Sequence, residues 1–309
     1  MKKLLAGLLT ATALTLAAPA LAATIIVVAH GQANDPFWSV VKNGVEYAAK
    51  QTGATVEFRS PETFDMVAMA QLIDAAVNQK PDGIVVSIPD ADALGPSIQA
   101  AVAAGIPVIS MNSGSDVSKA LGALLHVGQD EETAGRLAGE KLKEMGGTKG
   151  LCVNQEVGNV SLDLRCKGFA DGFGGAVTVL PTSNDPTEIQ SKVSAAIQAD
   201  PTIDTIMALG ASTAGEPSVE AVKAAGKGQG AIKVASFDLS AKFLEDVKAG
   251  DAAFAIDQQQ FLQGYLPVVF LALYADYGLM PGGNVPSGPN LITAEKAGQV
   301  VDLSAKGIR

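Results

Sequence analysis

Side chains able to hydrogen-bond to hydroxyl groups recur directly after short apolar runs of this chain. They are carboxylates, amides and one guanidinium, accompanied by two aromatic rings: Asp35, Phe37, Trp38, Asp90, Asn112, Arg165, Asp238 and Gln258. Carboxylates and amides accept from or donate to paired hydroxyls, and an arginine donates two hydrogen bonds in a fixed plane. Aromatic rings pack against the apolar C–H face of a pyranose or polyol. Together these residue types predict a site for a small carbohydrate.

The same residues also fit purely structural roles. Phe37 and Trp38 begin a helical stretch and fit a hydrophobic core. Asp238 precedes the sequence LSAKF and fits a helix N-cap, a role that is compatible with ligand contact. Arg165 fits a surface ion pair, and the two glutamines that follow Gln258 compete with it for the same position.

The elements that position these residues alternate between apolar runs and amphipathic stretches. The apolar runs are residues 24–30, 55–60, 83–89, 107–112, 124–128, 150–156, 177–182, 205–210, 232–238 and 252–257. The helical stretches are about 37–52, 64–79, 91–105, 130–145, 160–173, 187–199, 214–226, 239–249 and 259–278. Nearly continuous apolar strands that alternate with helices predict parallel sheets covered on both faces. His30, at the end of the first run, fits either a ligand contact or a hydrogen bond at a strand end.

The ten predicted strands divide into two sets of five, and each set suits one doubly wound domain of about 130 residues. The fold class is therefore α/β, with two doubly wound parallel-sheet domains joined by hinge crossings and the ligand in the cleft between them. We expect an N-terminal lobe of residues 24–128 plus about 258–285. The C-terminal lobe then holds residues 129–257 plus about 286–309.

The N-terminus has the pattern of a secretory signal peptide over residues 1–23. Lys2 and Lys3 precede an apolar run, and a small-residue pattern predicts cleavage near Ala22 or Ala23. The apolar run is too short for a membrane anchor, and no cysteine follows it to take a lipid. We therefore expect an exported protein of the periplasm that is not embedded in the membrane.

Composition excludes several classes of function. A formal net charge of −10 without a Lys/Arg cluster argues against nucleic-acid binding. Only 2 His and 2 Cys argue against a zinc site, and we expect neither a metal nor a cofactor. The sequence has no nucleophile-elbow motif, so we expect a binding protein and not an enzyme. The absence of a long exposed apolar helix predicts a monomer.

Cys152 and Cys166 are 14 residues apart. An oxidising compartment favours a disulfide between them, which we predict. The alternative is a pair of buried thiols in a strand and the helix that follows it.

Five segments, in the right order, resemble the ribose-type periplasmic sugar-binding proteins of ABC importers, which share their two-domain body with lactose-repressor-like regulators. The segments are NDPFW, PVISMNSG, RCKGF, VASFD and AIDQQQFLQG, and the resemblance covers residues 24–309.

The resemblance implies a role for each candidate. Phe37 and Trp38 are the aromatic walls and Phe237 is a third, while Arg165 clamps the ligand. Asp238 supplies a carboxylate, Gln258 an amide on a crossing strand, and Asn112 stands where the family often has an aspartate.

Two departures argue against ribose itself. Asp35 stands where the ribose-type pattern has asparagine, and Ser113 stands where it has a second arginine. The predicted ligand is therefore a pentose, a hexose or a sugar alcohol, captured by closure of two lobes and delivered to the permease subunits of the importer. The alternatives are a ligand carrier for a chemoreceptor or sensor kinase, and a binder of a non-sugar polar small molecule.

Overall fold

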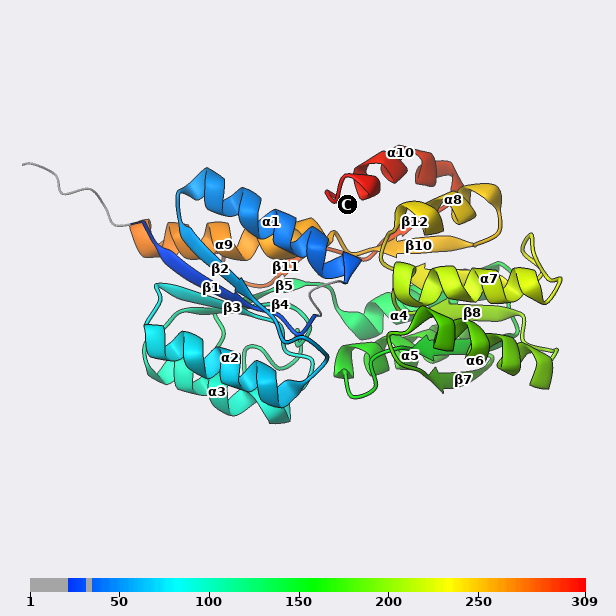
Figure 1. Cartoon of the computed structure of the whole chain (residues 1–309), viewed down its shortest axis with the longest axis horizontal. Coiled ribbons are helices and arrows are strands. Elements are labelled where there is room, and N and C mark those ends of the chain that lie inside the picture. The colour runs from blue at the N-terminus through cyan, green and yellow to red at the C-terminus, as the bar shows by residue number, and fades with distance from the viewer. Residues whose placement is uncertain (1–21, 32–34) are drawn as a thin grey trace, which may run out of the picture.

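The computed structural model describes residues 22–31 and 35–309, which form two lobes, each built on a six-stranded sheet (Figure 1). The strand order is β11-β5-β4-β3-β1-β2 in the first sheet and β12-β10-β9-β8-β6-β7 in the second. The predicted α/β fold class is confirmed. The predicted signal peptide falls almost wholly on residues outside the described ranges.

The first lobe has an all-parallel sheet with two helices on each face. Its strands are β1 (Thr24–Val28), β2 (Thr55–Arg59), β3 (Gly83–Val86), β4 (Val108–Asn112), β5 (Leu125–Gly128) and β11 (Val285–Pro286). One face packs on α1 (Pro36–Thr52) and α9 (Gln260–Tyr277), and the other on α2 (Met66–Gln79) and α3 (Ala91–Ala103). The residues of β3, β4 and β5 are all buried because both faces are covered.

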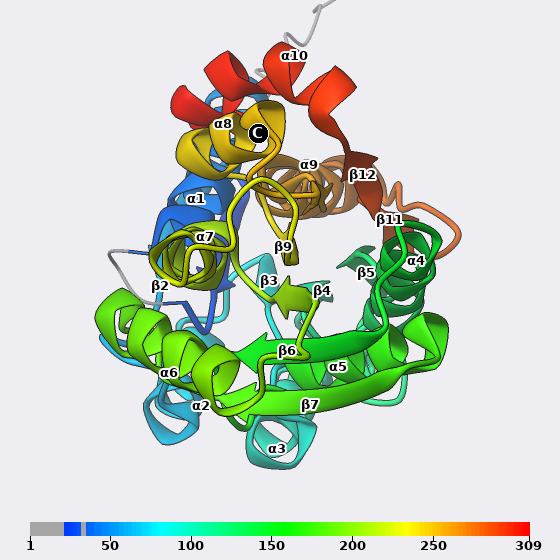
Figure 2. The same cartoon turned by 90° about the vertical axis from the view of Figure 1, so that its right-hand side faces the viewer.

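The second lobe repeats this plan with an antiparallel edge strand. Its strands are β6 (Lys149–Asn154), β7 (Ala176–Pro181), β8 (Thr205–Ala208), β9 (Lys233–Phe237), β10 (Phe254–Asp257) and the antiparallel β12 (Asn290–Ile292). One face packs on α4 (Glu131–Glu144) and α5 (Val160–Phe173). The other face packs on α6 (Pro186–Ala199), the π-helical turn Ala211–Gly215, α7 (Glu216–Ala224), α8 (Ala241–Ala249) and α10 (Ala294–Ala305), as Figure 2 shows.

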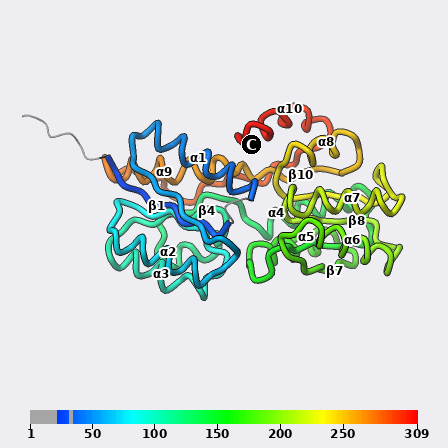
Figure 3. The backbone as a smooth tube through the Cα atoms, in the orientation of Figure 1, coloured from blue at the N-terminus to red at the C-terminus, as the bar shows by residue number. Residues whose placement is uncertain are grey.

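Within residues 35–309 the chain passes between the lobes three times (Figure 3). The passages follow β5, follow β10 and join β11 to β12. All ten predicted strands are present, and the sequence analysis missed β11, β12 and α10. The two missed strands have two and three residues, too few for a periodic pattern.

Cys152 on β6 and Cys166 on α5 form a disulfide. Both lie in the core cluster between the second sheet and its α4–α5 face. The bond ties α5, the helix that carries Arg165, to the sheet beneath it.

No helix among residues 22–31 and 35–309 combines the length and hydropathy needed to cross a membrane.

Close backbone contact between α4 and α5 depends on glycine. A Cβ atom on Gly168 would lie 2.0 Å from the carbonyl oxygen of Glu132, and one on Gly135 would lie 2.2 Å from that of Arg165. Any side chain at these positions therefore separates the two helices. The same contact recurs between α1 and α9, where a Cβ on Gly44 would lie 2.1 Å from the carbonyl oxygen of Phe261.

We expect Gly168→Ala to lower the free energy of unfolding by about 1–3 kcal/mol, because the added methyl group overpacks the helix contact. Gly298→Ala is the matched control: it lies in α10 with open space around its Cβ position. That change should stabilise the protein by up to about 1 kcal/mol through helix propensity alone. Urea unfolding of both variants measures the difference, and equal stabilities would contradict the glycine contact.

Candidate functional site

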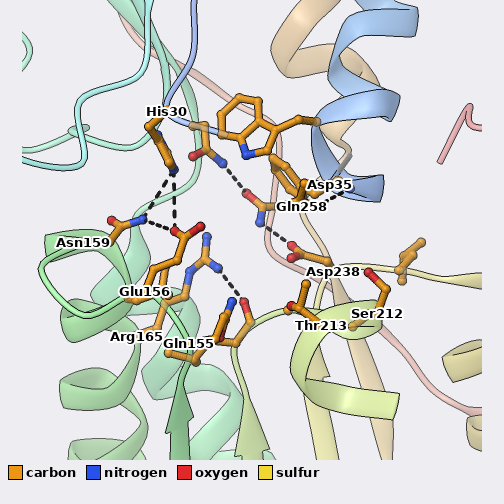
Figure 4. Close-up of a pocket in the computed structure, with 18 residues that line it drawn as sticks. His30, Asp35, Gln155, Glu156, Asn159, Arg165, Ser212, Thr213, Asp238 and Gln258 are labelled. Carbon is orange, nitrogen blue, oxygen red and sulfur yellow. Dashed lines mark hydrogen bonds and ion pairs between the residues drawn. The ribbon is translucent and has the colours of Figure 1, made fainter. Parts of the chain in front are cut away.

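A cavity lies between the lobes, at the carboxyl ends of the central strands (Figure 4). Seven of the nine predicted binding residues line it: Asp35, Phe37, Trp38, Asn112, Arg165, Asp238 and Gln258. Both lobes and the β10–α9 crossing contribute lining residues, because the carboxyl ends of the strands in the two sheets point toward the same space between the lobes.

Arg165 is held in place before any ligand arrives. Its Nε donates to Glu131 Oε2 at 2.6 Å and its Nη2 donates to Glu131 Oε1 at 3.0 Å. Its Nη1 donates to the carbonyl oxygen of Leu209 at 3.3 Å, and its Cζ lies 4.5 Å from the centre of the Phe237 ring. Arg165 is 3% exposed and Glu131 is 2% exposed, so the ion pair is buried and not a surface pair. These contacts fix the plane of the guanidinium at the cavity wall.

Phe237 does not line the cavity. Its side chain is fully buried in the core, where its ring supports the Arg165 guanidinium from below. The predicted third aromatic wall is therefore absent, and the ring acts through Arg165 by a cation–π contact.

Asp238 lies directly after β9 with a φ of 69°, a left-handed conformation that aspartate tolerates better than most residues. Its Oδ1 accepts from Gln258 Nε2 at 2.5 Å. Ser240, not Asp238, caps α8, since its hydroxyl accepts from the N–H of Phe243. Burial raises the pKa of Asp238 to about 7, and the nearby Arg165 opposes this rise.

A chain of side-chain amides links the lobes through the crossing. Gln258 Oε1 accepts from Gln263 Nε2 at 2.9 Å and from Asn112 Nδ2 at 3.5 Å. Because Gln258 also donates to Asp238, the chain runs from β4 of the first lobe to the end of β9 in the second. Gln263 Nε2 donates in addition to Ser287 Oγ at 3.0 Å, beside the third crossing.

The aromatic wall belongs to the start of α1. Asp35 caps this helix by accepting from the N–H of Phe37 at 2.9 Å. The rings of Phe37 and Trp38 meet edge to face at 5.1 Å, and Trp38 is 5% exposed. Burial, with a smaller contribution from the carboxylate of Glu156, raises the pKa of Asp35 to about 6.

Asp90 lies outside this cavity. Its Oδ1 accepts from the N–H groups of Asp92 and Ala93 at 2.9 and 3.0 Å, so it caps α3. Its sequence setting matches that of Asp35, because both carboxylates follow a strand and precede a helix. The difference is that α1 begins at the cavity and α3 does not.

Further polar residues line the cavity that the sequence analysis did not select: Gln155, Glu156, Asn159, Ser212 and Thr213. All follow β6 or β8, at the carboxyl ends of strands where parallel sheets bind ligands, and from these two segments the sequence analysis selected Arg165 alone.

On one side of the cavity, groups from the two lobes meet. His30 Nε2 of the first lobe lies 3.4 Å from Asn159 Nδ2 and 3.8 Å from Glu156 Oε2 of the second. Burial lowers the pKa of His30 to about 4, so the imidazole is neutral near pH 7.

Comparison with known proteins relates the chain to one family. A family model described as "Periplasmic binding protein domain" matches residues 25–279. The xylose/arabinose-binding protein of Sulfolobus acidocaldarius is 26% identical over 286 residues, which cover 87% of this chain and 70% of that protein. The ribose import binding protein of Bacillus subtilis is 26% identical over 246 residues, 75% of each chain.

A crystal structure of a carbohydrate transporter from Acidothermus cellulolyticus 11B in complex with myo-inositol is 37% identical. It superposes with a TM-score of 0.88, covering 94% of this chain and 100% of that one.

Asp238→Asn tests the electrostatics of the cavity. The folded-state pKa of Asp238 is raised from 3.8 to about 7, so the folded protein holds this proton more tightly than the unfolded chain. The resulting stability is fully present below about pH 4 and is lost as the pH rises through about 7. We therefore expect the free energy of unfolding of the protein with closed lobes to fall more steeply from pH 5 to pH 8 in the wild type than in Asp238→Asn.

Denaturant unfolding across this pH range measures the difference, with Asp90→Asn as the control carboxylate outside the cavity. Parallel pH profiles for the wild type and Asp238→Asn would contradict the assignment.

Proposed function

The chain belongs to the periplasmic binding protein family, and from that premise we propose that it captures a small sugar or polyol and delivers it to the membrane permease of an ABC importer. The observation that carries this proposal is the interlobe cavity, whose polar groups come from both lobes and from the crossing between them. Relatives named as xylose/arabinose- and ribose-binding proteins and the myo-inositol complex support the ligand class.

Each lobe alone offers only part of the hydrogen bonding that a polyol requires. Asp35 and Asn112 belong to the first lobe, whereas Arg165 and Asp238 belong to the second. A ligand that satisfies both sets binds the closed arrangement better than the open one, and this difference in affinity drives closure. The permease then distinguishes the closed, loaded protein by its shape.

The proposed location, oligomeric state and lack of catalysis rest on the family and on the N-terminal sequence. The predicted signal peptide directs the chain to the periplasm, where it acts as a monomer without cofactor or metal. Its relatives are named as binding proteins, so we propose transport and not catalysis.

The proposal is tested by titration of the fluorescence of Trp38, the single tryptophan of the chain. The protein is unfolded and refolded to remove carried-over ligand, and is then titrated with pentoses, hexoses and inositols. We expect a saturable change with micromolar or tighter affinity for one stereochemical set. A flat response to every compound, with an unchanged melting temperature, would refute carbohydrate binding.

Asp35→Asn and Asp90→Asn form a matched pair of variants. Both residues cap helices, and asparagine caps as well as aspartate, so neither change should alter stability much. Only Asp35 lines the cavity, and a hydrogen bond to a charged group contributes about 1.5–3 kcal/mol. We expect Asp35→Asn to weaken ligand binding by at least about tenfold. Asp90→Asn should bind as the wild type does.

Calorimetric titration of both variants with the best ligand measures this effect, and equal losses in affinity would contradict the assignment of Asp35. Arg165→Ala is a poorer probe, because it leaves the Glu131 carboxylate buried without its partner.

A further inference from the structure

The charges that line the cavity do not balance. Three carboxylates face it, from Asp35 of the first lobe and from Glu156 and Asp238 of the second. Among the described lining residues Arg165 is the sole cation, because burial keeps His30 neutral.

The positive charge of Arg165 is already matched. Glu131, which does not itself line the cavity, makes a two-point contact with the guanidinium at 2.6 and 3.0 Å. This pair is buried on both sides, so solvent screens it little. One guanidinium therefore faces four carboxylates, Glu131 included, and although it lowers the pKa of Asp238 it offsets the charges of the three lining carboxylates only in part.

Closure of the lobes brings these carboxylates together away from water. Asp35 and Asp238 come from opposite lobes. The charge of Glu156 raises the pKa of Asp35, and the charge of Asp35 raises the pKa of Asp238. A neutral polyol donates hydrogen bonds to the carboxylate oxygens but brings no compensating charge. Burying such charges without a countercharge is costly, so closure on a neutral ligand favours proton uptake at Asp35 and Asp238, whose pKa values burial raises.

A ligand that carries an ammonium group removes this penalty. The cation supplies both hydrogen-bond donors and positive charge, and hydrogen bonds between charged partners are roughly twice as strong as neutral ones. Asp238 retains an oxygen for such a contact, since Gln258 donates to Oδ1 alone. The rest of such a ligand still needs hydroxyl groups to bond the amides of the cavity and an apolar face to pack on Phe37 and Trp38.

We propose, building on the proposed function, that the preferred ligand of this cavity is an amine-bearing polyol, such as an amino sugar or an aminocyclitol. An anionic sugar, such as a uronic acid or a sugar phosphate, is excluded by the same charges.

The test compares ligand pairs that differ only in one amine. Calorimetry at pH 7 measures the affinity of the wild-type protein for D-glucosamine and D-glucose, and for amino-inositols and the matching inositols. We expect the amine of at least one pair to bind at least tenfold more tightly. Titrations in two buffers of different ionisation enthalpy should show proton uptake with the neutral member and less with the amine.

Variants assign the preference to the cavity. Asp238→Asn removes one carboxylate with little change in shape, and should reduce the ratio of the two affinities at least fivefold. Asp90→Asn, outside the cavity, should leave the ratio unchanged.

Neutral compounds that bind as tightly as their amines, without proton uptake, would overturn the inference and leave the proposed function standing. Binding of neither member of any pair would overturn both.

Discussion

The buried pair of Arg165 and Glu131 is the interaction on which the binding site depends. Glu131 is the first residue of α4, directly after the chain first passes between the lobes, and Arg165 lies in the middle of α5. Their contact requires the two helices to approach closely, which the facing glycines permit, and the disulfide to Cys166 anchors α5 to the sheet. Because unpaired charges are so costly inside a protein, the pair holds a guanidinium at the cavity wall in one orientation.

A chain of neutral side-chain amides forms the second polar feature of the cavity. Asn112, Gln258 and Gln263 are neutral, and they connect a strand end of one lobe with two of the crossings. The carboxylate of Asp238 ends this chain on the side of the second lobe. Gln258 lies on a crossing between the lobes, whereas His30 reaches Asn159 of the second lobe from the first. The cavity thus combines side chains of both lobes with an amide on a crossing between them.

The cavity carries an excess of negative charge that the protein does not neutralise by itself. Burial is the main cause of the raised pKa values of Asp35 and Asp238, and the charge of another carboxylate adds to it in each case. The same carboxylates that disfavour closure of the empty cleft are the acceptors for a ligand. Ligand binding and lobe closure are therefore linked through electrostatics as well as through hydrogen bonding.

The sequence by itself determined the elements and the fold class. Alternation of apolar runs and helical stretches is a local signal, so ten strands and the main helices were found, and the rule for parallel sheets placed seven of nine candidates at the cavity. Tertiary structure alone decided the rest. Asp35 and Asp90 share one local pattern and both cap a helix, and only the position of their helices decides that Asp35 lines the cavity and Asp90 does not. The partner of Arg165, the support by Phe237 and the short strands β11 and β12 depend on contacts between segments distant in sequence, which local periodicity does not encode.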